Sequence, residues 1–207
     1  MPKVGLTREK VVEQAAAVAD EVGLASLTLA AVAQRCGVSL PGLYKHVNGL
    51  DAVKRDIAVL AVREITGVLA AAAVGVSGRE ALTEFARAYR GYARVHPGRY
   101  ALTLHAPAPG DTGHAAAAAD AVGVIAAALQ GYKLEETALV HAIRLVRSAF
   151  HGIVSLETAG GFGLPESVDD TYAHLVDALD AEFRTLGRHG GPRRGGAADD
   201  DAAQLPG

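Results

Sequence analysis

The chain has 207 residues, half of them hydrophobic, which is enough for one large or two small packed domains and argues against an intrinsically disordered protein. Its single cysteine, Cys36, excludes an internal disulfide framework and a metal site built from several cysteines. The formal net charge of −3 excludes a uniformly basic nucleic-acid-binding chain. The acidity is uneven, because residues 1–56 hold seven Lys and Arg against six Asp and Glu, whereas residues 57–186 hold ten against fourteen.

The N-terminal ten residues lack the apolar stretch of a secretory signal. The most apolar run, residues 115–129, contains Asp120 and is shorter than the roughly 20 apolar residues that a membrane-spanning helix needs. We therefore expect a cytoplasmic protein without a membrane partner.

Apolar spacing, capping residues and Gly or Pro breaks divide the chain into about nine helices, and no run alternates as a strand would. Thr7 is placed to cap the first helix and Gly23 to end it. Capping patterns also begin at Ser77, which Glu80 follows, and at Ser167. The expected helices cover about residues 7–23, two segments within 27–47, then 50–74, 77–95, 97–104, 112–130, 134–158 and 167–186. The sequence therefore predicts an all-α fold.

Residues 27–47 are the most informative stretch, because they predict two short helices joined by a three-residue turn. Thr28 can cap the first helix, and Gly37 lies where the chain must reverse, a position that usually needs the left-handed conformation. Ser39 can cap the second helix, with Pro41 in its first turn, where the missing N–H costs nothing. This pattern is typical of a helix-turn-helix, which places its second helix in the major groove of DNA.

Small and apolar residues at fixed positions support the helix-turn-helix. Ala33 is small where the two helices approach each other. Leu43 and Val47 lie one turn apart, and we expect both to fill the shared core.

Composition divides the chain into three parts. We expect a helix-turn-helix domain over residues 1–56 and a second helical domain over residues 57–186. Residues 187–207, rich in Gly, Arg and Asp, have little to bury and are expected to form a disordered tail.

The order of these elements resembles the tetracycline-repressor (TetR) family of transcriptional regulators. The residues Leu43-Tyr44-Lys45-His46-Val47 are similar to the family's Leu-Tyr-x-His-Phe/Val signature at the end of the recognition helix. Further along, Phe150-His151-Gly152 resembles the Trp-His-Gly-type motif of one subgroup, with phenylalanine in place of tryptophan. It continues as Leu156-Glu157 and a glycine-rich loop over residues 160–165. The resemblance covers residues 7–186 and implies an N-terminal three-helix bundle followed by a helical ligand-binding and dimerisation domain.

The resemblance also implies that the third helix reads DNA and that a two-fold homodimer binds a double-stranded operator. The DNA-contacting residues carried over by position are Thr28, Ser39, Leu40, Pro41, Gly42, Tyr44, Lys45 and His46.

The chemistry of these side chains differs. Thr28, Tyr44 and His46 offer donors for phosphate oxygens, and Lys45 can donate to guanine O6 and N7 or to a phosphate. Residues 40–42 carry no side-chain hydrogen-bonding group, so DNA shape is expected to contribute to recognition. Other interpretations stay open, since the Tyr44 ring could pack against the first helix, His46 could act as a helix C-terminal cation and Lys45 could simply be solvated.

In this family the fourth to seventh helices bind a small-molecule effector, whose identity is unknown here. Aromatic side chains with a few donors in one helical region fit such a site, although each alone is more often core or surface. The candidate effector residues are Phe85, Tyr89, Tyr92, His96, Tyr100, Leu104, His105, Arg144, Arg147 and His151.

The family dimerises through its last two helices, and both are apolar over more than one face here. A helix that is apolar on two faces must be covered twice, either by its own domain and a partner or entirely within one subunit. The candidate interface residues are Val140, Phe150, Tyr172, Leu175, Val176, Leu179 and Phe183.

Enzyme signatures are missing from the sequence, which has no Walker loop, Gly-x-Ser-x-Gly, His-Glu-x-x-His or dinucleotide fingerprint. No two of the histidines at 96, 105, 114, 141 and 151 have the four-residue spacing of a helical metal pair. We therefore predict a DNA-binding repressor released by an effector, with no catalytic residue, metal or cofactor. Two alternatives stay open: a helical enzyme or small-molecule carrier with a degenerate DNA-binding segment, and an architectural DNA-binding protein without an effector.

Overall fold

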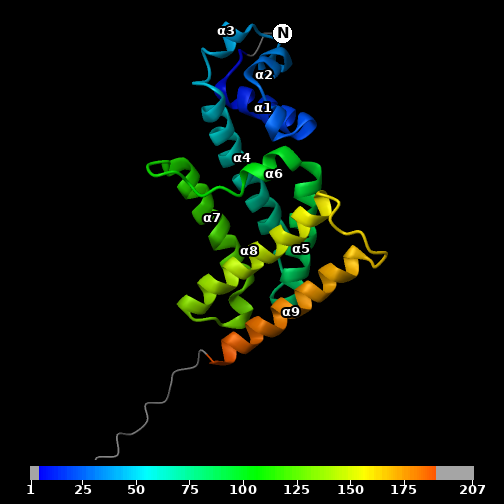
Figure 1. The fold of residues 1–207 in the computed structure, drawn as a ribbon. Helices are drawn as coiled ribbons and strands as arrows, with labels where there is room; N and C mark the ends of the chain where they lie inside the picture. Colours follow the sequence, from blue (N-terminus) through cyan, green and yellow to red (C-terminus); the bar gives the residue numbers. More distant parts are fainter. Residues whose placement is uncertain (1–4, 190–207) are drawn as a thin grey trace, which may run out of the picture.

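The computed structural model describes residues 5–189, and every regular element in that part of the chain is a helix (Figure 1). The α-helices are α1 Arg8–Val22, α2 Leu29–Cys36, α3 Leu40–Leu43, α4 Leu50–Ala72, α5 Gly78–Val95, α6 Pro97–Leu102, α7 Thr112–Ala128, α8 Glu136–Thr158 and α9 Val168–His189. Two 3₁₀ turns, η1 Leu24–Ser26 and η2 Gln130–Tyr132, lie between them. The predicted all-α fold is confirmed.

The helices form a head and a body, joined by α4 (Figure 1). We call α1, α2, α3 and the first half of α4 the head, and the second half of α4 together with α5, α7, α8 and α9 the body. The short helix α6 lies where the two meet and contacts α1, α4 and α5. The N-terminal end of the molecule therefore carries the helix-turn-helix well away from α8 and α9.

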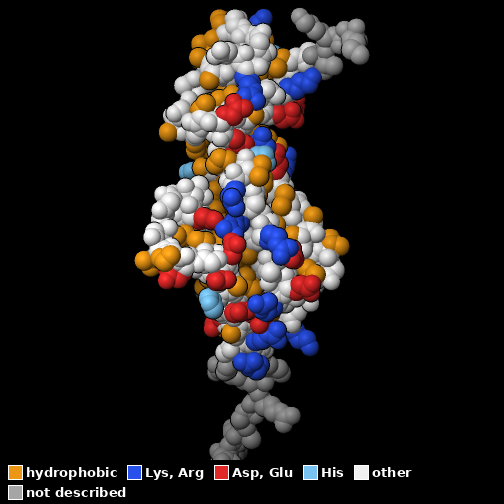
Figure 2. Space-filling view, turned by 90° about the vertical axis from the view of Figure 1, so that its right-hand side faces the viewer, with side chains coloured by type: hydrophobic (Ala, Val, Ile, Leu, Met, Phe, Trp, Pro, Cys, Tyr) orange, Lys and Arg blue, Asp and Glu red, His pale blue; other side chains and the backbone are white. Residues whose placement is uncertain are grey.

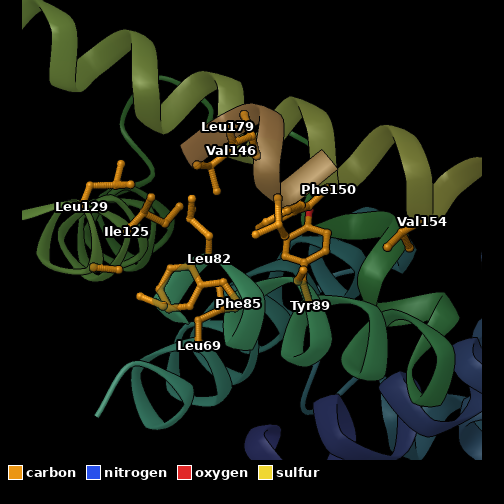
Figure 3. Close-up of a cluster of buried hydrophobic side chains, with 14 of the residues drawn as sticks. Leu69, Leu82, Phe85, Tyr89, Ile125, Leu129, Val146, Phe150, Val154 and Leu179 are labelled. Carbon is orange, nitrogen blue, oxygen red and sulfur yellow. The ribbon is translucent and has the colours of Figure 1, made fainter. Parts of the chain in front are cut away.

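The head and the body each have an apolar cluster of their own. In the head, α1, α2, α3 and α4 bury side chains such as Val11, Val32, Leu43 and Ile57 completely. In the body, aromatic rings from α5, α8 and α9 form the centre of a larger cluster with Leu82 and Leu129 (Figure 3). The complete burial of Leu43 and near-complete burial of Val47 confirm their expected place in the core.

The two clusters meet within α4, which runs unbroken past residue 56. Ile57 and Ala58 belong to the head cluster, whereas Ile65 and Leu69 belong to the body cluster. Leu102 of α6 also packs into the head cluster, although it lies far along the chain. The packing boundary therefore lies a few residues beyond position 56.

Side-chain caps confirm most of the predicted helix starts. The hydroxyls of Thr7, Thr28 and Ser39 accept hydrogen bonds from backbone N–H groups three residues on. The Ser167 hydroxyl likewise accepts from the Asp170 N–H at 3.4 Å. The cap predicted at Ser77 is wrong: its side chain makes no such bond, and the next residue, Gly78, enters α5 with φ +58°. The left-handed conformation of Gly78 changes the direction in which the chain enters α5.

Several helix ends differ from those predicted. The helix expected to end at Leu104 stops at Leu102, because the Thr103 N–H and hydroxyl both bond to the Tyr100 carbonyl and close the last turn. The helix expected from Leu134 begins at Glu136. Residues 187–189, predicted as the start of the tail, continue α9, and the rest of the predicted tail lies outside the described residues.

Among the described residues, α8 is the one helix long and apolar enough to cross a membrane by length and composition. One face of α8 packs into the body through Ala142, Val146 and Phe150.

Candidate nucleic-acid interface and effector region

The turn between α2 and α3 has the geometry that a helix-turn-helix requires. Gly37 adopts φ +66° and ψ +31°, which confirms the predicted left-handed position. Its N–H bonds to the Gln34 carbonyl, and the Val38 N–H bonds to the Ala33 carbonyl, so the last carbonyls of α2 are satisfied while the chain reverses.

The second helix of the motif is shorter than expected. It forms one α-helical turn over Leu40–Leu43 and then continues as tighter turns, in which the Lys45 and His46 N–H groups bond to carbonyls three residues back. Gly42 contributes to this, since glycine favours helix weakly.

The predicted DNA-contacting residues all lie at this end of the head. Most are exposed: Thr28, Ser39, Leu40, Pro41, Tyr44 and Lys45, with Gly42 and His46 half-buried. The Tyr44 side chain is 55% exposed, so it contributes little to the core and faces solvent. Leu43 and Val47 are buried in the head cluster and hold the segment in place.

Two of these hydroxyls already have a partner. Thr28 and Ser39 accept backbone N–H groups as helix caps, at 3.2 Å each. A hydroxyl that accepts one hydrogen bond can still donate its own proton, so each cap could donate to a phosphate oxygen at the same time.

Two arginines of the head are paired with carboxylates. Arg35 forms an ion pair with Glu21 at 2.6 Å, and Arg8 forms one with Asp56 at 2.8 Å. Lys45 makes no ion pair within the described residues and is exposed. Over the face shown in Figure 2, basic and acidic side chains are interspersed along the length of the molecule. Lys45 is therefore a cation available for contact in the turn that follows α3.

Comparison with known proteins agrees with this arrangement. A family model described as the tetracyclin repressor-like C-terminal domain matches residues 82–179. The uncharacterized HTH-type transcriptional regulator Rv0681 of Mycobacterium tuberculosis is 33% identical over 187 residues, covering 90% of this chain and 85% of that protein. The uncharacterized HTH-type transcriptional regulator YobS of Bacillus subtilis is 31% identical over 178 residues, covering 84% of this chain and 91% of that protein. The chain belongs to the TetR family of transcriptional regulators.

The fold agrees as well. A TetR variant from Acinetobacter baumannii AYE, crystallised with minocycline, superposes with a TM-score of 0.64 at 21% identity, covering 88% of this chain and 98% of that one. This TetR-family protein is therefore a DNA-binding regulator whose helix-turn-helix is formed by α2 and α3.

The predicted effector residues fall into three groups in the structure. Phe85, Tyr89, Tyr92 and Tyr100 are buried, His96 and His151 are half-buried, and Leu104, His105, Arg144 and Arg147 are exposed. The structure does not bring all ten to one site.

One subset forms a polar chain inside the body. The Tyr100 hydroxyl lies 2.6 Å from His151 Nδ1 and 3.4 Å from the Tyr89 hydroxyl. Burial raises the pKa of the Tyr100 phenol and of the Tyr89 phenol, so both stay protonated and available as donors. Nearby, Arg147 donates to the Thr103 carbonyl at 3.1 Å.

These side chains fill the core instead of lining a hollow. The Tyr89 ring packs edge-on against Tyr100 with centroids 5.6 Å apart and lies 6.2 Å from the ring of Phe150 (Figure 3). Three surface grooves are lined by other residues: about 770 Å³ between α1, α4 and the start of α7, about 360 Å³ between α5 and α9, and about 570 Å³ where α5 begins.

Tyr92 and His96 turn away from this subset, toward α4 and α1. The Tyr92 hydroxyl donates to Glu64 at 2.9 Å, and His96 Nδ1 lies 3.1 Å from Asp20. The charged residues Asp20, Glu64 and Arg99 at this junction were not singled out by the sequence, because their partners are 35 to 79 positions apart.

The predicted dimer residues are mostly buried within one subunit. Phe150, Tyr172, Val176, Leu179 and Phe183 are each less than a tenth exposed and belong to the body cluster. These five side chains therefore leave little surface for a partner within the described subunit, and their place in a dimer interface stays a prediction. Val140 is 43% exposed and Leu175 half-buried, so these two remain accessible.

Among residues 5–189, no three His, Cys, Asp or Glu side chains cluster in a way that could hold a metal ion. Cys36 is half-buried in the head, and burial raises the pKa of its thiol.

Proposed function

We propose that this regulator is a homodimeric repressor that leaves a double-stranded DNA operator when a small molecule binds to its body. The observation that carries the DNA-binding part is the exposed turn of α3, with Tyr44 and the unpaired Lys45 at the end of the head. Two such ends related by two-fold symmetry would enter successive major grooves, about 34–36 Å apart.

Lys45→Ala tests the operator contact. If Lys45 reads a base, we expect operator affinity to fall by about 1–3 kcal/mol while binding to unrelated DNA changes much less. Fluorescence anisotropy at several salt concentrations measures both affinities, with the DNA upstream of the regulator's own gene as operator and an unrelated DNA for comparison. Lys133→Ala, at an exposed position of the body, is the matched control. An equal loss on both DNAs would make Lys45 a phosphate contact only.

Exposed apolar residues of α8 support the dimer. Leu145 and Leu156 are 42% and 53% exposed, and half-buried Ala138 and Ala149 lie on the same stripe of the helix. A second copy of α8 with its neighbour α9 could cover this stripe, as expected of an interface between identical subunits.

The hydrogen-bonded side chains of Tyr89, Tyr100 and His151 are the part of the body best suited to recognise a polar group on an effector. Because aromatic rings fill the space around it, an effector would have to bind a minor conformer in which they separate. Effector and operator would then weaken each other by the same coupling free energy.

A thermal-shift screen of a small-molecule library tests this, since a ligand that binds the folded state raises the unfolding midpoint. For any compound that does so, Tyr100→Phe should weaken binding, because it removes the hydroxyl that His151 contacts. A compound that binds Tyr100→Phe as tightly as the wild type does not use this site.

The Phe150-His151-Gly152 sequence supports placing the chain in the Trp-His-Gly-type subgroup. Phe150 is buried in the body and His151 bonds to Tyr100, so the motif joins α8 to α6. A non-enzymatic role and a cytoplasmic location are part of the same proposal and follow from the regulator relatives.

A further inference from the structure

The six-residue helix α6 is attached to the head by an unusual set of charged contacts. Its own preceding residue, His96, provides no side-chain cap. Instead, Asp20 near the end of α1 accepts the backbone N–H of Arg99 at 2.9 Å, so a carboxylate from the head caps a helix that lies 79 positions away in sequence.

The Arg99 side chain also links α6 to the second half of α4, which belongs to the body. Its Nη1 donates to both oxygens of Glu64 on α4, at 3.0 and 3.2 Å. Its Nε lies 3.0 Å from Asp20 in an ion pair, although the angle does not make a hydrogen bond. The side chain of Arg99 is only 16% exposed and that of Asp20 12%, so water screens the Arg99–Asp20 pair much less than a surface ion pair.

Close packing leaves α6 little freedom against α1. Gly98 is buried, and a Cβ atom added there would lie 2.2 Å from the Ala19 carbonyl carbon and oxygen. Glycine at this position therefore allows the two backbones to approach, and any larger residue would push α6 and α1 apart.

The opposite side of α6 is attached to the body. Tyr100, the residue after Arg99, contacts His151 of α8, and the Thr103 carbonyl accepts from Arg147 of the same helix. Acidic, basic and histidine side chains lie together at the level where head and body meet in Figure 2. One short helix thus joins α1 and α4 on one side to α8 on the other.

We infer that Arg99 is a positioning residue: by linking Asp20 of α1 to Glu64 of α4 from α6, it fixes the direction of the helix-turn-helix head relative to the body. The inference rests on the proposed dimeric DNA binding, because the direction of each head then sets the spacing between two recognition segments. The link through α6 is a second connection between head and body, besides the continuous helix α4.

A distance measurement that needs no DNA tests the inference. In the full chain with Cys36→Ala, spin labels are attached at Glu13→Cys in the head and Glu136→Cys in the body, both exposed positions. Labelled chains are diluted with unlabelled ones so that each pair lies within one subunit. We expect one narrow distance distribution in this background, and a shifted or broadened one when Arg99→Met is added.

Matched variants separate positioning from a general loss of packing. Arg63→Met, on the exposed side of α4, should leave the distribution unchanged, and Arg99→Lys should restore it in part by contacting one carboxylate. Gly98→Ala should shift the distribution, whereas Gly91→Ala, with open space around its Cβ position, should not.

Operator binding gives the second readout. Arg99→Met should lower operator affinity about 5- to 150-fold, the usual range of coupling between sites, while affinity for unrelated DNA at low salt changes little. If the wild type fails to bind any operator, the proposed function is wrong, and the distance distributions still decide the inference.

Wild-type distance distributions and operator affinity in Arg99→Met would overturn the inference. Circular dichroism checks that each variant keeps its helical content. Should Arg99→Met not fold, Asp20→Asn decides by the same two criteria, because its amide oxygen can still accept the Arg99 N–H but carries no charge.

Discussion

At the scale of the residue, the hydroxyls of Thr28 and Ser39 cap the two helices of the motif, and we propose that the same groups also contact DNA phosphates. Each oxygen accepts the backbone N–H that starts a helix of the DNA-binding motif, and each proton remains free for a phosphate. The same group thereby fixes the direction of the helix and offers a contact whose position that helix determines.

Replacing Thr28 in two ways separates the tasks. Thr28→Ala removes the cap and the donor, so we expect the free energy of unfolding to fall by about 1 kcal/mol and operator affinity to fall with it. Thr28→Asp keeps a capping oxygen but repels phosphate, so stability should stay near that of the wild type while operator affinity falls. Denaturant unfolding and anisotropy measure the two; operator affinity unchanged in Thr28→Asp would argue against a phosphate contact.

At the scale of the element, Arg90 of α5 joins three helices. Its guanidinium forms ion pairs with Glu157 near the end of α8 and with Asp169 at the start of α9, and lies 4.6 Å from the centre of the Tyr172 ring. Hydrogen bonds from Arg90 hold the pKa of Glu157 below its usual value of 4.5. The long connection between α8 and α9 is thereby anchored at both ends to α5.

The lowered pKa predicts a pH dependence. A carboxylate whose pKa is lower in the folded chain stabilises that chain fully above its usual pKa, and the contribution is lost as the pH falls through the folded value. Below pH 4.5 the wild type should therefore lose stability more steeply than Glu157→Gln. Urea unfolding across this range measures the slopes. Glu166→Gln, in the exposed α8–α9 connection, is the control, and equal slopes for wild type and Glu157→Gln would contradict the prediction.

At the scale of the whole molecule, the apolar surface that one subunit leaves uncovered indicates where a second would bind. The α8 residues Leu145 and Leu156 stay exposed although α8 is apolar enough to resemble a membrane span, and only a third of its most apolar window is buried. Apolar surface of this kind, continued over one helix, is typical of an interface.

A charge on this surface should dissociate the dimer. We expect Leu156→Glu to shift the chain from dimer to monomer and to weaken operator binding, because both half-sites would no longer be held together. Sedimentation velocity reads the assembly state. Val74→Glu changes an even more exposed apolar residue, in the α4–α5 connection, and should leave the assembly unchanged. A monomeric wild type would rule out the dimer altogether.

Features that depend on neighbours in sequence could be predicted. The caps at Thr7, Thr28 and Ser39 and the left-handed Gly37 follow from local hydrogen bonding and backbone sterics, which a few adjacent residues determine. The prediction of a cap at Ser77 was wrong because the left-handed conformation of Gly78 sets where the Ser77 hydroxyl lies relative to the first N–H groups of α5.

The sequence by itself determined the all-α fold, the helix-turn-helix and the family, since helix periodicity, caps and the Leu43–Val47 signature are local properties. Only the tertiary structure decided that Phe150 and Phe183 fill the subunit's own core, and that Asp20, Glu64 and Arg99 meet. The physical reason is that an apolar stripe specifies burial but not which surface covers it, and an ion pair between distant helices depends on how whole elements dock.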